Sequence, residues 1–194
     1  HAVAGASGGS IQAMEWAAAY PDFVPRVVHV IGPGFALSPY VLEMLDVWAM
    51  PVRLDPKWNN GDYYGKDEPV TGTAQALKII TITARAHGWA EKAFGYKWAD
   101  SSKDPAAEIT NLFAIEDTLN KAGATRAASV DANSLIYTAK ANQLFNLGDE
   151  VKKIKAKILF VPAESDLIFP PELSLRAAER FKAQGGTAEV ASIA

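Results

Sequence analysis

The chain starts with His1-Ala2-Val3-Ala4-Gly5-Ala6-Ser7-Gly8-Gly9-Ser10, the stretch that decides the fold. Its first four residues are mostly apolar and predict a short strand that stops at Gly5. A helical pattern follows, in which Ile11, Met14 and Ala18 share one face. Residues 26–31 are rich in β-branched side chains and predict a buried strand. Strand, tight glycine turn, helix and strand make one parallel crossover unit, so we expect an α/β fold with a parallel sheet.

The pattern changes between residues 38 and 147, where no strand signal is present. Four helices are predicted there, and Asp104-Pro105 has the residue types that begin a helix, a capping side chain followed by proline. Connections within a sheet are far shorter than this stretch, so we expect an inserted helical lid. The α/β pattern then returns with a strand, a helix and a final strand candidate. The predicted helices of the lid cover residues 41–49, 73–86, 104–121 and 131–145. The later elements are a strand at 157–161, a helix from 171 and a strand at 187–193. The predicted α/β core therefore comprises residues 1–37 and 148–194.

The turn after the first strand carries candidate chemistry. Gly5-Ala6-Ser7-Gly8-Gly9 fits the pattern G-x-S-x-G, and a strand before it with a helix after it is the context in which this pattern presents a nucleophile. We expect small residues at Gly5 and Gly9 to permit the sharp turn, and the N–H of Gly8 to be one donor to an oxyanion. Because the pattern also occurs by chance, a tight turn with an inert serine is the alternative interpretation.

The same glycine-rich turn also resembles the phosphate-binding turn of short-chain dehydrogenases. Those enzymes need a tyrosine followed four residues later by a lysine. Tyr137 has Lys140 at three residues, and none of the other five tyrosines has a lysine at four. The second predicted strand ends at Ile31 without the acidic residue that would hold a ribose. The dehydrogenase interpretation is therefore rejected.

A second loop, Glu164-Ser165-Asp166, follows the strand at residues 157–161. A carboxylate there can orient an imidazole, so Asp166 is the candidate triad acid, with Glu164 as the competing acid and a purely structural carboxylate as the alternative. A hydrolase triad needs a histidine later in the chain than the acid. All three histidines, His1, His29 and His87, come earlier, and His29 in mid-strand is expected to be a packing residue. Residues 1–194 are therefore not expected to complete a triad.

Composition narrows the classes of function. The 194 residues are 49% hydrophobic and 21% charged, which is typical of a globular domain. A net charge of −3 provides no basic excess for phosphates, so we expect no nucleic-acid partner. The longest uncharged apolar stretch is interrupted by glycines and prolines, so we expect no membrane span. The absence of cysteine excludes disulfides and a cysteine nucleophile, and without a metal-binding pattern we expect no metal.

Several blocks together resemble the homoserine O-acetyltransferase family of α/β-hydrolase-fold acyltransferases. The segment from Gly5 to Trp16, GASGGSIQAMEW, is similar to that family's G-G-S-M-G-G-M-Q-A-L-E-W. Further blocks follow in the family's order, and the resemblance covers nearly the whole chain. These blocks are Asp62-Tyr63-Tyr64-Gly65, Asp131-Ala132-Asn133-Ser134 with Tyr137, and Ser165-Asp166-Leu167-Ile168-Phe169-Pro170-Pro171.

The resemblance implies a two-step acyl transfer. Ser7 would take an acetyl group from acetyl-CoA, a cosubstrate rather than a bound cofactor, and pass it to a hydroxyl of a small molecule such as homoserine. It further implies Asp166 as the triad acid, Gly8 as an oxyanion donor, a catalytic histidine beyond Ala194 and further strands before His1. Because the chain starts in mid-strand without an initiator methionine, we expect it to be a piece of a longer protein. The family implies a homodimer in the cytoplasm, although the sequence does not decide whether a signal peptide precedes this piece.

Two departures from the family pattern bear on the substrate. The methionine that follows the family's serine is Gly8 here, and the tyrosine–arginine pair on a lid helix, which binds the amino-acid substrate, aligns with Ala84-Arg85. Arg85 can still pair with a carboxylate; the alternative is a solvated helix charge. Three interpretations stay open: a transferase acting on homoserine or another alcohol, a carboxylic-ester hydrolase of the same fold, and a non-catalytic chain.

Overall fold

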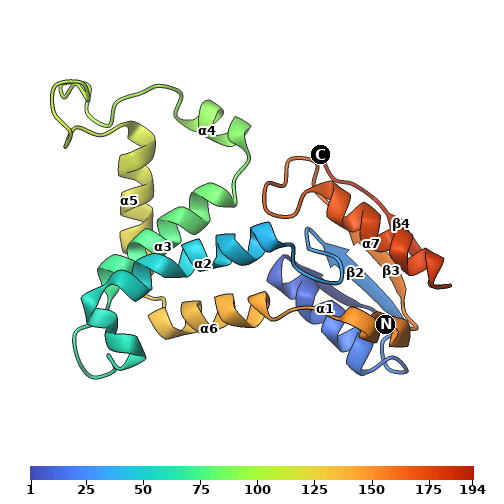
Figure 1. The fold of residues 1–194 in the computed structure, drawn as a ribbon. Coiled ribbons are helices and arrows are strands. Elements are labelled where there is room, and N and C mark those ends of the chain that lie inside the picture. Colours follow the sequence, from blue (N-terminus) through green and yellow to red (C-terminus); the bar gives the residue numbers. More distant parts are fainter. The chain divides into compact units, whose positions relative to one another are not determined.

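The computed structural model describes residues 1–194, which divide into two compact units (Figure 1). Residues 44–139 form the helical unit, and the residues before and after them form the sheet unit. Both divisions fall inside helices, α2 (Pro39–Leu54) and α6 (Ala132–Gln143). The insertion predicted at residues 38–147 therefore contains the whole helical unit and, at each end, a short segment that belongs to the sheet unit.

The sheet unit contains four parallel strands in the order β1-β2-β3-β4. The register places Val27 of the second strand opposite both Val3 and Ile158 of its neighbours. Because all four strands are parallel, their carboxyl ends lie at one edge of the sheet. The predicted α/β class with a parallel sheet is confirmed. The strands are β1 (Val3–Ala6), β2 (Arg26–Val30), β3 (Lys157–Val161) and β4 (Ala188–Val190).

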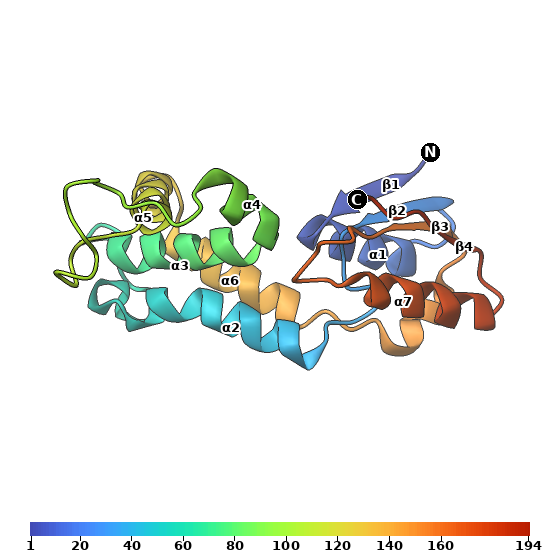
Figure 2. The ribbon, with the colours of Figure 1, turned by 90° about the horizontal axis from the view of Figure 1, so that it is seen from above.

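Two helices cover the same face of the sheet, α1 (Gly8–Ala19) and α7 (Pro171–Ala183) (Figure 2). Successive right-handed crossovers that advance in one direction place their helices on one face, so the connectivity explains the arrangement. The apolar stripe predicted for the first helix is confirmed, since Ile11, Met14 and Ala18 are all buried. The strand residues that are buried on this side are Val27, His29, Ile158 and Phe160.

The helical unit has a small core of its own. Its main packing pair is α3 (Val70–Thr83) with α5 (Ala114–Ala127), and α4 (His87–Ala93) comes between them in the chain. In neither unit does a helix combine the length and the apolar character needed to cross a membrane. Two short 3-10 helices complete the fold, η1 (Pro56–Gly61) in this unit and η2 (Gly148–Lys153) in the sheet unit. The buried side chains of the helical core are Val52, Tyr63, Ala74, Ala76, Leu77, Ala127 and Ala132.

The helix predicted over residues 104–121 is wrong in its first half, because α5 begins only at Ala114. The Asp104 carboxylate accepts a hydrogen bond at 2.8 Å from the N–H two residues later, which closes a turn instead of capping a helix. Further turns follow, and an antiparallel bridge between Trp98 and Phe113 comes directly before the helix. The short helix α4 was missed altogether.

A polar network joins two of the sequence blocks in the helical unit. The Tyr63 hydroxyl donates to the Asp131 carboxylate and accepts a bond from the Asn133 N–H at 3.1 Å. The Tyr64 hydroxyl and the Ser134 N–H also donate to this carboxylate, at 3.0 and 2.7 Å. These bonds, led by the one from Tyr63, lower the pKa of Asp131 to about 2. Burial and the bond to Asp131 raise the pKa of Tyr63, so the pair is a neutral phenol on a carboxylate.

Tyr63→Phe should destabilise the helical unit by about 1–3 kcal/mol, because it removes one of the two hydroxyl donors to Asp131 and leaves the Asn133 N–H without a partner. Tyr64→Phe is the matched control: it removes the same atom from a side chain that is 63% exposed, and its cost should stay within about 0.5 kcal/mol. Urea unfolding followed by far-UV circular dichroism measures both. Equal losses in the two variants would show that Tyr63 has no special role in this network.

One histidine is part of the sheet-unit core. The His29 side chain is fully buried, and its ring centroid lies 5.1 Å from that of Phe160. Its Nε2 accepts a hydrogen bond from the Gly34 N–H at 3.3 Å, whereas Nδ1 has no partner. Burial lowers the pKa of His29 to about 4, so the imidazole is neutral near pH 7. This placement agrees with the packing role expected for a histidine in mid-strand.

We expect the sheet unit to lose stability as the pH falls from about 6.5 to about 4. The unfolded chain binds a proton on His29 near the ordinary pKa of 6.5 and the folded chain only near 4, so acid favours unfolding in this window. The whole effect amounts to about 3 kcal/mol. Unfolding at several pH values measures it, and His29→Gln, which keeps an acceptor for Gly34 but does not titrate, should flatten the slope. The same slope in the variant would assign the pH dependence to other groups.

Candidate active site

Ser7 occupies the turn between β1 and α1, at the carboxyl edge of the sheet. Its backbone has φ 52° and ψ −122°, a conformation that costs a side-chain-bearing residue about 1–3 kcal/mol and that is typical of functional turns. Two hydrogen bonds hold it there: the Ser7 N–H donates to the Val30 carbonyl at 3.0 Å, and the Ser10 hydroxyl donates to the Ser7 carbonyl at 2.6 Å. The turn leaves Ser7 exposed.

A close backbone approach explains why the motif begins with glycine. A Cβ on Gly5 would lie 2.0 Å from the Gly9 carbonyl oxygen, so no side chain fits there unless the backbone moves. A Cβ on Gly9 would meet nothing within 4 Å. The expectation that small residues permit the turn therefore holds most strongly at Gly5, where a side chain is excluded, whereas Gly9 has room for one and contributes its carbonyl to the close approach.

Gly5→Ala should destabilise the sheet unit by more than about 2 kcal/mol, because backbone atoms must shift to admit the methyl group. Gly9→Ala adds the same group to open space in the first turn of α1 and should be neutral or stabilising by up to about 1 kcal/mol, since alanine forms helices better than glycine. Thermal unfolding of the two variants checks this difference. A Gly9→Ala protein as unstable as Gly5→Ala would contradict the geometry of the turn.

Gly8 is the first residue of α1, and its N–H donates to no acceptor within the chain. A helix N-terminus carries partial positive charge, so a free N–H at this place suits an anionic oxygen. Gly8 also follows Ser7 directly, which puts the donor beside the expected nucleophile. The geometry is what an oxyanion donor requires, and that role of Gly8 stays a prediction.

Asp166 lies in the loop after β3, at the same edge of the sheet as Ser7. Its Oδ1 accepts hydrogen bonds from the N–H groups of Ile168 and Phe169 at 2.8 and 2.9 Å. These bonds orient the side chain and leave Oδ2 available, as a carboxylate that receives an imidazole N–H requires. The competing Glu164 is exposed, and its carboxylate makes no hydrogen bond. Asp166 is thus the oriented carboxylate, and its part in catalysis stays a prediction.

The histidines lie elsewhere. His29 is buried in β2 with its Nε2 already engaged by Gly34. His1 precedes β1 and so lies toward the opposite edge of the sheet from Ser7, and His87 begins α4 in the helical unit. These positions agree with the expectation that none of the three is a good candidate for the base.

Arg85 belongs to the helical unit and follows the end of α3 at Thr83, so it is not on a helix as predicted. Its exposed guanidinium lies 5.1 Å from the centre of the Trp89 ring. Such a cation–π contact gives the charge an internal partner that the sequence pattern did not indicate. The contact between Arg85 and a substrate carboxylate stays a prediction.

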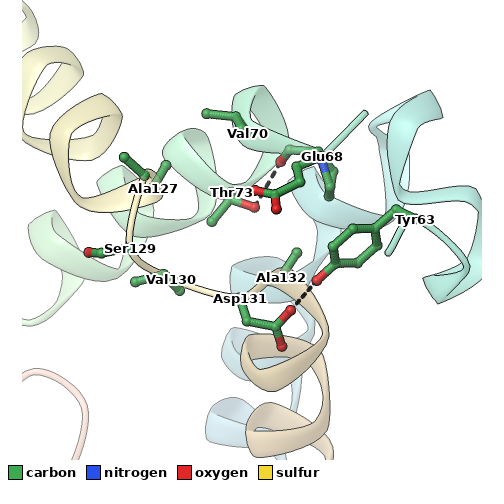
Figure 3. Close-up of a pocket in the computed structure, with 11 residues that line it drawn as sticks. Tyr63, Glu68, Val70, Thr73, Ala127, Ser129, Val130, Asp131 and Ala132 are labelled. Carbon is green, nitrogen blue, oxygen red and sulfur yellow. Dashed lines mark hydrogen bonds between the residues drawn. The ribbon is translucent and has the colours of Figure 1, made fainter. Parts of the chain in front are cut away.

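A pocket of about 240 Å³ lies within the helical unit (Figure 3). Two internal hydrogen bonds are visible at its wall, from Tyr63 to Asp131 and from the Thr73 hydroxyl to the Pro69 carbonyl, the latter at 2.8 Å. Its lining includes none of the residues predicted for catalysis or substrate binding. The Tyr63 hydroxyl holds the segment before α3 to the start of α6, and the Thr73 hydroxyl bonds to the residue that precedes α3, so both have a structural role.

Sequence reasoning missed two side chains beside the turn, Ser10 and Asn142. Ser10 directly follows the motif and stands where the family pattern has glycine, so that difference was a usable signal. Asn142 comes from the far end of α6, and its amide lies beside Gly8 only because of the fold. No local pattern could have identified it.

Comparison with known proteins shows which proteins the chain is similar to. No protein-family model matches it. A homoserine O-acetyltransferase from Methanohalobium evestigatum is 31% identical over 176 residues, which cover 88% of this chain and 36% of that protein. A serine O-succinyltransferase from Emericella nidulans is 36% identical over 148 residues, covering 76% of this chain and 28% of that protein. The crystal structure of esterase E22 matches with a TM-score of 0.90 at 37% identity, over 99% of this chain and 54% of that one.

The chain is a relative of the homoserine O-acetyltransferases and has the α/β-hydrolase fold. The resemblance expected from the sequence blocks is thereby confirmed. The chain spans about half or less of the length of each of these three proteins, so the activity of the whole protein is a matter for proposal. For this α/β-hydrolase relative, the strained serine turn and the oriented carboxylate after β3 are the two described features on which a proposal can rest.

Proposed function

We propose that the protein is a serine acyltransferase, which moves an acyl group such as acetyl from acyl-CoA to a hydroxyl of a small molecule such as homoserine. The observation that carries the proposal is the strained Ser7 backbone, with φ 52°, next to the free N–H of Gly8 at the carboxyl edge of a parallel sheet. Relatives named as acyltransferases match 76% and 88% of the chain and support the same class of reaction.

In the proposed reaction the Ser7 Oγ attacks the thioester carbonyl carbon while an imidazole takes the hydroxyl proton. The Gly8 N–H stabilises the charge that develops on the carbonyl oxygen. The carbon–sulfur bond then breaks, and coenzyme A leaves as the thiol with that proton. The acceptor hydroxyl attacks the acyl-Ser7 ester in the same manner, gives its proton through the imidazole to the Ser7 Oγ, and leaves as the ester. Asp166 orients the imidazole by accepting its N–H on Oδ2.

The proposal treats acyl-CoA as a cosubstrate and includes neither a bound cofactor nor a metal. Its partners are small molecules, not nucleic acids or membranes, and Arg85 is the candidate for pairing with a carboxylate of the acceptor. By the family resemblance, the protein acts as a homodimer in the cytoplasm.

A carboxylic-ester hydrolase of the same fold is the second candidate. Esterase E22 is 37% identical with a TM-score of 0.90, and Ala84 stands where the family pattern has the substrate-binding tyrosine. In this case water rather than an alcohol would attack the acyl-Ser7 ester. The first half of the reaction, acylation of Ser7, is common to both candidates.

A fluorophosphonate should add once to the full-length protein, at Ser7, and the adduct should be absent from Ser7→Ala. Asp166→Asn should slow the labelling by about 10³-fold or more, because the imidazole loses its orienting acceptor. Glu164→Gln is the matched control, a neutralised carboxylate in the same loop, and should label at the unchanged rate. Intact mass and peptide mapping measure the adduct. An unlabelled parent protein would contradict the nucleophilic role and favour the non-catalytic interpretation.

The transferase and the hydrolase are distinguished by the fate of the acyl group. With acetyl-CoA, a transferase should release coenzyme A faster as homoserine or serine is added, and the acetyl ester of that alcohol should accumulate. Release that does not depend on the alcohol, with acetate as the product, would contradict the transferase and support the hydrolase. Chromatography of the products together with a thiol assay for coenzyme A gives both readings.

A further inference from the structure

The amide of Asn142 lies beside the expected oxyanion donor. A Cβ placed on Gly8 would lie 3.5 Å from Asn142 Oδ1 and 3.9 Å from its Nδ2, and apart from its chain neighbours and the backbone of α1 nothing else comes within 4 Å of that point. Gly8 carries the free N–H that follows Ser7. A molecule that binds at Ser7 through this N–H therefore comes within reach of the Asn142 amide.

The position of Asn142 is fixed by the chain on either side of it. It stands near the end of α6, and the next residue, Gln143, donates its Nε2 to the backbone of α2 at 2.8 Å. Phe145 is buried in the core of the sheet unit, and Asn146 forms an antiparallel bridge with the segment that leads into α2. All of these contacts lie within the sheet unit. A side chain held by a helix and by core packing keeps its position more closely than one on a loop.

The residue types indicate what such a position can recognise. The resembling family has a methionine where this chain has Gly8, so an apolar side chain is replaced by space next to a polar amide. An asparagine amide offers an acceptor oxygen and two N–H donors, whereas a thioether offers no donor. A site that forms hydrogen bonds with a substrate discriminates against analogues without the polar group far better than an apolar site can.

We propose that Asn142 is a specificity-determining residue of the Ser7 site, where its amide forms a hydrogen bond with a polar group of the acyl acceptor. The inference rests on the proposed function and limits the class of alcohols that serve as acyl acceptors. The preferred acceptor is a small alcohol with a second polar group near the reacting hydroxyl, and simple alkyl alcohols are poor acceptors.

The test uses the full-length protein with p-nitrophenyl acetate. The burst of p-nitrophenol measures acylation of Ser7, and the ratio of products formed with homoserine and with 1-propanol, both present, measures acceptor choice. Asn142→Leu has a similar size without hydrogen-bonding groups and should reduce the preference for homoserine by about tenfold, the worth of one lost hydrogen bond, with the burst unchanged. Asn142→Ala removes the same amide and provides a second variant with the same expected change in preference. Gly9→Ala is the control, since its methyl group meets nothing.

The outcomes separate this inference from the proposed function. An unchanged product ratio in both variants, with a normal burst, would overturn the role of Asn142 and leave the acyltransferase proposal standing. A burst lost in both variants, with normal melting temperatures, would assign the amide to acylation and contradict its role toward the acceptor. No burst in the parent protein would overturn the proposed function and this inference with it.

Discussion

The hydrogen bond from the Ser7 N–H to the Val30 carbonyl, at 3.0 Å, ties the strained serine turn to the end of β2. Without such a restraint a residue at φ 52° would relax, because its conformation is unfavourable by itself. The N–H of the same peptide group points the other way: the Ile31 N–H donates to the Val161 carbonyl of β3 at 2.9 Å, on the strand that leads to Asp166. A single peptide group, between Val30 and Ile31, therefore links the turn of the candidate nucleophile with the strand that precedes the candidate acid.

The end of β2 is itself strained and closely packed. Ile31 has φ 40°, which is unusual for a β-branched residue, so two strained residues lie at one edge of the sheet. Beneath them Ser10 is fully buried, and a Cβ on Gly32 would come within 1.9 Å of its hydroxyl and 2.6 Å of the His29 ring. A neutral imidazole fits this space as an acceptor for the Gly34 N–H. The core and the serine turn are thus one packed structure, in which a side chain is excluded at Gly32 after β2 as it is at Gly5 before the serine.

Local sequence patterns were enough to predict the part of the fold in which each element forms where its own residues favour it. The β1–α1–β2 unit and the residue types at the ends of β1 and β3 could be predicted because each element is defined by its own pattern. Asp104 shows where this fails: its residue type fits a helix start, but a turn and the bridge between Trp98 and Phe113 delay the helix. Asn142 could not be found at all, because its position beside Gly8 depends on how α6 returns to the sheet unit.

For this protein to be a transferase, the acceptor must compete successfully with water for the acyl-Ser7 ester. Water at about 55 M competes with an acceptor at about 1 mM for the acyl-Ser7 ester, a disadvantage that corresponds to about 6 kcal/mol. The proposed hydrogen bond from Asn142 would offset about 1 kcal/mol of this. The remainder would have to come from further contacts with the acceptor and from exclusion of water from the acyl-Ser7 ester. Similar proteins are named as a transferase and as an esterase, as expected if a few contacts with the acceptor separate the two activities on this fold.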